Sequence, residues 1–90
     1  MSAVNGAVEA MVRAFAVELA PIRVNALHPG IVGDSPAWSS RADALEAIRQ
    51  RTPTGRTIAL AEMADGVLFL LENGAANGVN LTLDGGWLLT

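Results

Sequence analysis

The residues His28, Pro29 and Gly30 are the part of the sequence whose types and order best suit contact with a small molecule. An apolar run from Ile22 to Leu27 precedes them directly, and short apolar runs of this kind are typical of buried strands. In open α/β sheets, ligands bind just outside the carboxyl ends of the strands. A Pro-Gly turn at such an end leaves little side-chain bulk between the backbone and a ligand. We therefore expect a ligand to contact the backbone there.

The absence of certain residue types limits the reactions that these residues could catalyse. The 90 residues include no cysteine, no tyrosine and no lysine, so any mechanism that needs one of these must obtain it from elsewhere. The net charge is −3 and basic residues are not clustered, which excludes the usual footprint of nucleic-acid binding. No apolar run approaches the ~20 residues that span a bilayer, and no signal-peptide pattern is present. We expect a soluble cytoplasmic protein.

The first third of the chain has the pattern of a helix that leads into a strand. Apolar side chains recur at three- and four-residue steps from Val4 to Leu19, which predicts an amphipathic helix over residues 2–19. Small alanines beside this stripe would let another helix approach closely. Pro21 ends the helix, and the apolar run 22–28 predicts a buried strand immediately after it.

The rest of the chain repeats the order of helix and strand after a long excursion. Residues 31–57 are rich in loop-forming types and include one short helical pattern over 42–51. Apolar positions from Met63 to Leu71 predict another helix, which the Asn-Gly pair at 73–74 ends. Alternating apolar and polar residues predict a strand over 79–83.

This order predicts an α/β protein with two parallel strands joined by a right-handed crossover. The excursion 33–53 is long enough to act as a lid over a ligand. Two parallel strands do not make a stable sheet, and a pair this apolar would expose apolar faces and unpaired edges. Either other chains cover them, or the chain is a piece of a larger domain.

Several dispersed motifs together resemble the C-terminal part of the short-chain dehydrogenase/reductase family. They are the Glu-Leu-Ala-Pro-Ile-Arg-Val-Asn link at 18–25, the Pro-Gly pair after the strand, the Pro-x-Gly-Arg loop at 53–56 and the closing Asn-Gly-x-x-x-x-x-Asp-Gly-Gly at 77–86. The resemblance covers nearly all 90 residues. It implies the C-terminal part of a Rossmann-like doubly wound parallel sheet, in the order helix, strand, lobe, helix, strand, which is incomplete alone.

The resemblance also implies where NAD or NADP would lie in a complete domain. Pro29, Gly30, Ile31 and Val32 match the segment whose backbone meets the nicotinamide end of the cofactor. Asp34 stands where the family often has a cofactor-contacting threonine, and an aspartate there repels phosphate unless its carboxylate is turned away.

Further implications of the resemblance concern the substrate and the partners. Residues 1–90 would be the C-terminal segment of an NAD(P)-binding domain for a carbonyl or alcohol substrate, with 33–57 as the family's variable substrate lobe. Helix 2–19 and the C-terminal strand resemble elements at the family's two subunit interfaces. A homo-oligomer is therefore expected.

The family's catalytic groups have no counterpart in this sequence. Its Gly-rich phosphate-binding turn belongs to a first βα unit that has no match here, and its catalytic serine and tyrosine would lie upstream. The comparison places Met1 where the catalytic lysine of Tyr-x-x-x-Lys would fall. No catalytic residue is assigned, and residues 1–90 are not expected to catalyse hydride transfer by themselves.

Three side chains near the proposed cofactor segment each have a functional and a structural interpretation. His28 either contacts a ligand or caps the turn. Asp34 either lies near a cofactor or is a solvated loop carboxylate. Trp38 either lines a substrate pocket or packs within the lobe.

Three further features favour structural interpretations. Arg56 follows the Pro-x-Gly turn and is expected to hold that loop through hydrogen bonds. Trp87 is expected in a core or an interface, and Asp84, Gly85 and Gly86 are expected to form a turn.

Two hypotheses of different classes follow. In the first, the chain is the C-terminal part of an NAD(P)-dependent oxidoreductase. In the second, it is a non-enzymatic module that binds a full-length relative through its interface helices and C-terminal strand.

Overall fold

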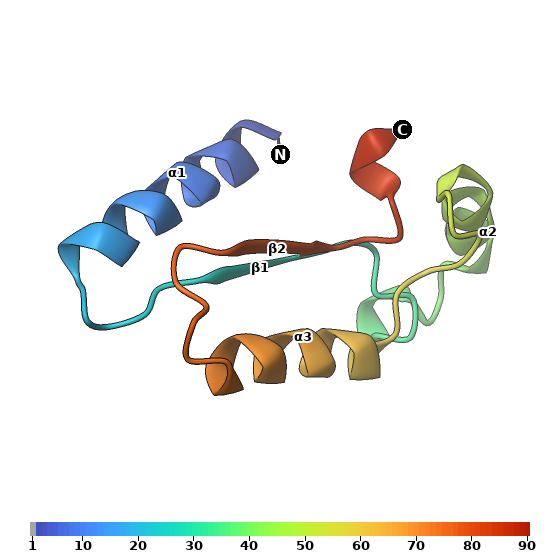
Figure 1. Cartoon of the computed structure of the whole chain (residues 1–90). Coiled ribbons are helices and arrows are strands. Elements are labelled where there is room, and N and C mark those ends of the chain that lie inside the picture. The colour runs from blue at the N-terminus through green and yellow to red at the C-terminus, as the bar shows by residue number, and fades with distance from the viewer. Residues whose placement is uncertain (1) are drawn as a thin grey trace.

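A computed structural model describes residues 2–90 and contains two strands and several helices (Figure 1). Met1, which the sequence comparison placed at the family's lysine position, lies outside the described residues. In chain order the elements are α1 (Ser2–Glu18), β1 (Ala26–Pro29), the 3-10 helix η1 (Pro36–Trp38), α2 (Ala42–Arg51), α3 (Leu60–Glu72), β2 (Asn80–Leu83) and the 3-10 helix η2 (Trp87–Leu89). No helix among these residues is long and apolar enough to cross a membrane.

The two strands form a parallel sheet with helices on both faces, which confirms the predicted α/β class. Ala26 pairs with Asn80, and the register continues to Pro29 and Leu83. In Figure 1, α1 covers one face of the sheet and α3 covers the other.

The α3 face of the sheet is packed so closely that the helix needs a glycine where it crosses the strands. A Cβ atom on Gly66 would lie 2.6 Å from the Leu83 Cδ1 atom and 3.1 Å from the Leu27 Cδ1 atom. Glycine weakens a helix by ~1 kcal/mol relative to alanine. Its presence here is explained by this close approach.

The first strand starts later than the sequence predicts. The apolar run suggested residues 22–28, but β1 begins only at Ala26. Before that point, side chains supply part of the pairing: the Val24 N–H donates to Asn77 Oδ1 at 3.0 Å, and Asn25 Oδ1 accepts from the Val79 N–H at 2.9 Å. One backbone hydrogen bond remains, from the Gly78 N–H to the Val24 oxygen at 2.8 Å. Residues 22–25 therefore join the segment before β2 without forming regular strand.

Arg23, in the segment between α1 and β1, binds the C-terminal end of α3. Its guanidinium donates to the carbonyl oxygens of Leu70, Leu71 and Ala76, at 2.7, 2.8 and 2.9 Å. A cation at a helix C-terminus also complements the helix dipole. The link between α1 and β1 is thus bound to the C-terminal end of α3.

The excursion between β1 and α3 is closed at its base by backbone hydrogen bonds. The Ile58 N–H donates to the Ile31 oxygen at 2.9 Å, and the Gly33 N–H donates to the Ile58 oxygen at 3.1 Å. We call residues 33–57 the lobe and this pair of hydrogen bonds its neck. Helix α2 spans residues 42–51 as predicted, and Leu45 is its buried residue.

The core within residues 2–90 is small, and many apolar side chains remain exposed. The buried apolar residues are Val12, Ala16, Leu45, Ile58, Leu70 and Ala76. Apolar side chains of α1 and α3 lie at the surface, including Met11 at 51% and Leu71 at 66% exposure. The fold is therefore incomplete alone, as predicted.

Candidate cofactor-binding site

The segment 29–32 lies where the chain leaves the carboxyl end of β1. The Gly30 N–H donates to the Leu83 oxygen at 3.0 Å, so pairing with β2 continues one residue beyond the strand. The Val32 oxygen accepts from the Ser35 N–H at 3.1 Å. Within residues 2–90, neither the Ile31 nor the Val32 N–H group has a hydrogen-bond acceptor. Two backbone donors therefore remain available at this end of the sheet.

A glycine is required at position 30 because the backbone of Asp84 lies directly beside it. A Cβ atom at this position would lie 2.7 Å from the Asp84 Cα atom and 2.8 Å from the Asp84 Cβ atom. Because Asp84 follows β2 directly, the absence of a side chain at Gly30 lets the carboxyl ends of the two strands approach each other. The lack of bulk, which the sequence analysis attributed to a ligand, has this structural cause.

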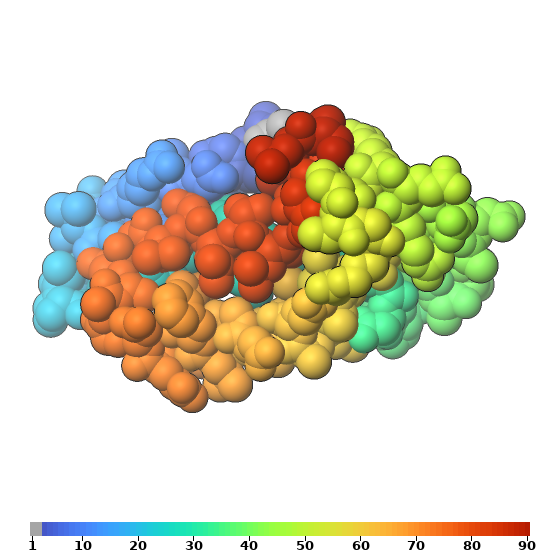
Figure 2. Space-filling view, turned by 45° about the vertical axis from the view of Figure 1, so that its right-hand side comes forward, coloured from blue at the N-terminus to red at the C-terminus, as the bar shows by residue number. Residues whose placement is uncertain are grey.

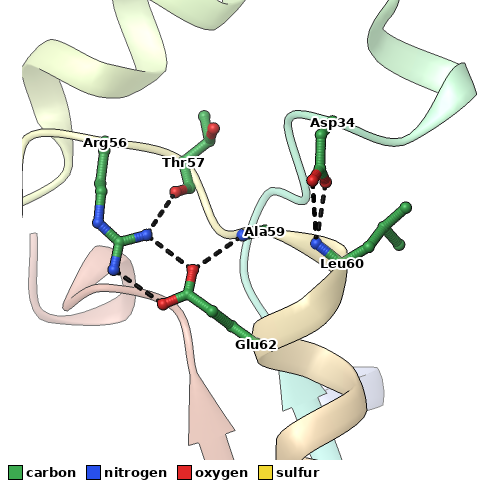
Figure 3. A network of polar contacts seen from close by, with 6 residues as sticks. All are labelled: Asp34, Arg56, Thr57, Ala59, Leu60 and Glu62. Atoms are coloured by element: carbon green, nitrogen blue, oxygen red, sulfur yellow. Dashed lines mark hydrogen bonds and ion pairs between the residues drawn. The ribbon is translucent and has the colours of Figure 1, made fainter.

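Asp34 caps the N-terminus of α3. Its Oδ1 and Oδ2 atoms accept from the Leu60 N–H at 2.9 and 3.2 Å (Figure 3). The N-cap residue Ala59 has no side-chain acceptor of its own, so an aspartate from another segment takes that role. Neither interpretation drawn from the sequence included this contact. The carboxylate is directed at α3.

Arg56 and Glu62 form a two-point ion pair on the other side of the same helix start. The distances are 2.7 Å from Nη1 to Oε1 and 2.8 Å from Nη2 to Oε2. Glu62 Oε1 also accepts from the Ala59 N–H at 2.9 Å, and Arg56 donates to the Thr57 oxygen at 3.1 Å. The prediction that Arg56 holds its loop through hydrogen bonds is confirmed.

The ionisation of this pair reflects these contacts. The hydrogen bond from Arg56, helped by the Ala59 N–H, lowers the pKa of Glu62 from 4.5 to about 2. The hydrogen bond to Glu62 raises the pKa of Arg56. Both side chains are substantially exposed, so water screens their attraction.

Figure 3 shows that both ends of the lobe are anchored to the first turn of α3. Asp34 on the outgoing chain binds the Leu60 N–H, and Arg56 on the returning chain binds Glu62. The candidate cofactor segment and the lobe therefore share one fixed support.

His28 belongs to the sheet and not to the turn. Its Nε2 atom lies 2.9 Å from Asn80 Oδ1, and the Asn80 amide donates to the Glu9 oxygen of α1 at 3.4 Å. The ring therefore links β1, β2 and α1. The turn cap expected from the sequence does not describe this arrangement, and the ligand contact stays a prediction.

The two tryptophans each lie beside an arginine. Trp38, in η1, is half-buried and has the Arg41 guanidinium 5.5 Å from its ring centroid. It lies within the lobe, and both of its interpretations stay predictions. Trp87 has the Arg51 guanidinium 4.2 Å from its ring centroid.

The predicted turn after β2 is confirmed. Asp84 Oδ1 accepts from the Gly86 N–H at 2.9 Å, and Asp84 Oδ2 accepts from the Leu88 N–H at 3.0 Å. Gly85 and Gly86 have φ angles of +65° and +92°, which glycine adopts without strain.

A protein-family model described as enoyl-(acyl carrier protein) reductase matches residues 1–88. Bovine L-xylulose reductase is 37% identical over 94 residues, and cyclopentanol dehydrogenase from a Comamonas strain is 38% identical over 90 residues. The chain belongs to the short-chain dehydrogenase/reductase family. Its match is to the C-terminal part, as the sequence motifs predicted.

Solved structures of short-chain dehydrogenases/reductases have the same arrangement of elements. A crystal structure of a small-chain dehydrogenase matches with a TM-score of 0.85 and 34% identity, over 99% of this chain and 39% of that one. Another, in complex with NADPH, matches with a TM-score of 0.84 and 33% identity, over 98% of this chain and 42% of that one. These relatives confirm the Rossmann-type fold, and the second confirms that the family binds this type of cofactor.

The chain spans less than two fifths of the length of the curated relatives it matches. It covers 38% of the bovine reductase and 36% of the cyclopentanol dehydrogenase, although those matches include 96% and 92% of this chain.

Some residues of this short-chain dehydrogenase/reductase chain were missed by sequence reasoning. Arg23, Asn25 and Asn77 hold the entry to β1, and Arg51 contacts the C-terminal turn. Arg23 and Asn25 lie in the family's Ile-Arg-Val-Asn motif, which was the one available signal for their importance. Nothing in the local sequence signals the Arg51 contact, because its partners lie more than 30 residues away.

Proposed function

We propose that residues 1–90 are the C-terminal part of an NAD(P)-dependent oxidoreductase that acts on a carbonyl or alcohol substrate. The observation that carries this proposal is the match over 99% of this chain, but only 39% of a small-chain dehydrogenase, at a TM-score of 0.85. The sequence has no tyrosine or lysine, so residues 1–90 would not be catalytic by themselves.

In this proposal Pro29, Gly30, Ile31 and Val32 contact the nicotinamide end of the cofactor. The unpaired N–H groups of Ile31 and Val32 are suited to a carboxamide oxygen, which accepts hydrogen bonds. When bound, the nicotinamide would supply or accept the hydride. The chain's own contribution is to hold that ring at the end of β1. Because the carboxylate of Asp34 is engaged by the Leu60 N–H, its charge is directed away from this segment.

The other parts of the chain have matching roles in the proposal. Residues 1–90 form the C-terminal segment of the NAD(P)-binding domain, and residues 33–57 form its variable substrate lobe. Helix α1 and the C-terminal strand contribute to interfaces of a homo-oligomer. The exposed apolar side chains of α1 support such a role, among them Val4, Met11 and Phe15. We place the protein in the cytoplasm because residues 1–90 contain no cysteine, which suits a reducing compartment.

The surface beside β1 supports the proposal that these residues belong to a longer polypeptide. A groove lies between β1 and α3, and it is lined by Leu27, Val67, Leu70 and Leu71 together with Arg23 and Asn25. In a doubly wound sheet, successive strands of one half lie side by side in chain order. A strand that precedes β1 would therefore lie on its free edge and cover this groove.

The test is to purify the native polypeptide that carries this sequence and to measure its intact mass and its NADPH binding. We expect a mass well above that of residues 1–90, a Tyr-x-x-x-Lys motif whose lysine stands in place of Met1, and NADPH bound with micromolar affinity or better. A longer polypeptide that binds neither NADH nor NADPH would contradict the proposal.

The exposed α1 stripe also favours the second candidate function, a non-enzymatic module that binds a full-length relative. This function predicts a native polypeptide with the mass of residues 1–90. It also predicts that a longer short-chain dehydrogenase/reductase co-purifies with it, and that the Met11→Glu variant loses this partner. If the native polypeptide has the mass of residues 1–90 but no longer relative co-purifies with it, this second function is excluded.

A further inference from the structure

The last residue of α2 is bound to the C-terminal turn of the chain. The Arg51 guanidinium lies 4.2 Å from the centroid of the Trp87 ring, a distance at which a cation and an aromatic face attract. Arg51 Nε also donates to Thr90 Oγ1 at 3.0 Å. Figure 2 shows the red C-terminal segment in contact with the yellow-green part of the lobe. We call Arg51, Trp87 and Thr90 the latch.

Backbone contacts bring the same two segments together. The Thr54 N–H donates to the Gly85 oxygen at 3.2 Å. A Cβ atom on Gly85 would lie 2.5 Å from Thr54 Oγ1, and one on Gly86 would lie 2.9 Å from Pro53 Cγ. The returning end of the lobe therefore rests directly on the turn after β2.

The C-terminal turn is itself firmly built, so it can serve as a support. The carboxylate of Asp84 accepts from the N–H groups of Gly86 and Leu88, at 2.9 and 3.0 Å. Thr90 Oγ1 donates to the Trp87 oxygen at 2.6 Å. These hydrogen bonds fix the latch residues Trp87 and Thr90 relative to β2.

Within α2 itself, Arg51 makes the contacts with the C-terminal turn. Leu45 is the helix's buried residue, and the ion pair between Arg49 and Glu46 is internal to the helix. By contrast, the contacts that hold the segment 29–32 do not involve the latch: they come from β2, from Ile58 and through Asp34. Loss of the latch should therefore move α2 and leave the segment 29–32 in place.

We propose that the latch positions α2, and that Trp87 and Thr90 are thereby specificity-determining positioning residues for the substrate. This inference rests on the proposed function, in which the lobe binds the substrate. It goes beyond that function because it assigns the fit of the substrate to residues of the C-terminal turn, which lie outside the lobe. Changes in the latch should alter the KM for the substrate and leave the cofactor affinity unchanged.

The latch itself is tested by hydrogen–deuterium exchange in the native polypeptide that carries this sequence. We expect the amides of α2 to exchange at least roughly tenfold faster in Arg51→Ala and in Trp87→Ala, because local opening is governed by such contacts. The double variant should exchange no faster than Arg51→Ala, because that single change already removes the contacts of Arg51 with both Trp87 and Thr90. Arg49→Ala removes the same charge from the same helix and should leave exchange unchanged. Unchanged exchange in Arg51→Ala and Trp87→Ala would overturn the latch.

The role in specificity is tested by kinetics of the native oxidoreductase. Trp87→Ala should raise the KM for the substrate by roughly tenfold, the scale of a partly desolvated cation–π contact, with kcat and the Kd for NAD(P)H unchanged. Trp87→Phe keeps an aromatic face under Arg51 and should restore most of the KM. Equal losses in kcat and in cofactor affinity, or no rescue by phenylalanine, would overturn the inference.

The two experiments distinguish a failure of the proposed function from a failure of the latch. A native polypeptide that binds no NAD(P)H contradicts the proposed function and removes the specificity role with it. The exchange measurement still decides whether the latch holds α2.

Discussion

The carboxylate of Asp34 serves the backbone of another element. It accepts from the Leu60 N–H, which would otherwise be one of the unpaired donors at the start of α3. At Asp34, where the sequence analysis expected the position of a cofactor-contacting threonine, the structure has a helix cap. A negative charge is acceptable at this position because the helix N-terminus is electropositive.

Replacing Asp34 should weaken the start of α3. We expect Asp34→Ala to lower the free energy of unfolding by ~1 kcal/mol, the usual contribution of an N-cap, and Asp34→Asn to lower it by less because one acceptor oxygen remains. Urea denaturation followed by circular dichroism measures both. Asp65→Ala removes an exposed carboxylate from the same helix and serves as the control. A loss no larger than in that control would contradict the cap.

Glu62 should make stability depend on pH in acid. Its pKa is about 2 in the folded protein and 4.5 ordinarily, so the ionised carboxylate stabilises the fold fully above about pH 4.5. This stabilisation is lost as the pH falls toward about 2, where the folded-state carboxylate becomes protonated. Glu62→Gln should therefore be less stable than the parent protein at pH 7, with a difference that shrinks below pH 4.5.

Urea unfolding midpoints at several pH values measure this difference. Glu46→Gln, which breaks an exposed ion pair within α2, is the matched control and should have the smaller effect at pH 7. A Glu62→Gln difference that stays constant from pH 7 to about pH 2 would show that the ion pair with Arg56 does not stabilise the fold.

At the scale of elements, the two strands depend on a close approach at their carboxyl ends. A side chain on Gly30 would overlap the backbone of Asp84, which cannot move aside as a flexible side chain can. Gly30→Ala should therefore destabilise the protein by about 1–3 kcal/mol, the usual cost of overpacking.

Thermal or urea unfolding of Gly30→Ala measures this cost. Gly74→Ala is the control, because nothing lies within 4 Å of a Cβ atom there. The pairing of Gly30 with Leu83 should also weaken, so the Gly30 amide should exchange faster in the alanine variant. Equal stability of the two variants would mean that the strand ends can separate freely.

The sequence predicted the elements well where one local pattern determined them. Helix α2 has the predicted bounds, and α1 ends at Glu18, one residue before the predicted end. The predicted start of β1 was wrong. An apolar run does not reveal that the Val24 N–H is bound by the side chain of Asn77, which lies more than 50 residues away.

The same limit applies to the site. The position of the segment 29–32 at a strand end follows from local patterns. The cap by Asp34 and the contact of Arg51 with Trp87 join segments distant in sequence, so only the folded chain brings them together.

The molecule as a whole has a free edge at β1 and an apolar groove beside it. Leu71 is 66% exposed and lines this groove. In the proposed function, another part of the longer polypeptide covers this surface.

Leu71→Glu should therefore have different effects in two contexts. In residues 1–90 the change should be within ~0.5 kcal/mol, as for most surface positions. In the longer native polypeptide of the proposed function, it should cost ~3 kcal/mol or more, because an unpaired charge would be buried.

Urea denaturation of both polypeptides makes the comparison. Leu68→Glu, at a position that is 49% exposed and does not line the groove, is the matched control. Equal effects of Leu71→Glu in the two polypeptides would mean that the groove stays uncovered.

The neck has a consequence for how proteins with this architecture diversify. The chain enters and leaves the lobe through one pair of backbone hydrogen bonds between Ile31, Gly33 and Ile58. The free energy needed to close a loop rises only slowly with its length. A segment of different length and composition can therefore be exchanged between residues 33 and 57 without disturbing the register of β1 and β2. In the proposed function, in which this segment binds the substrate, the insert can thus change while the frame stays constant.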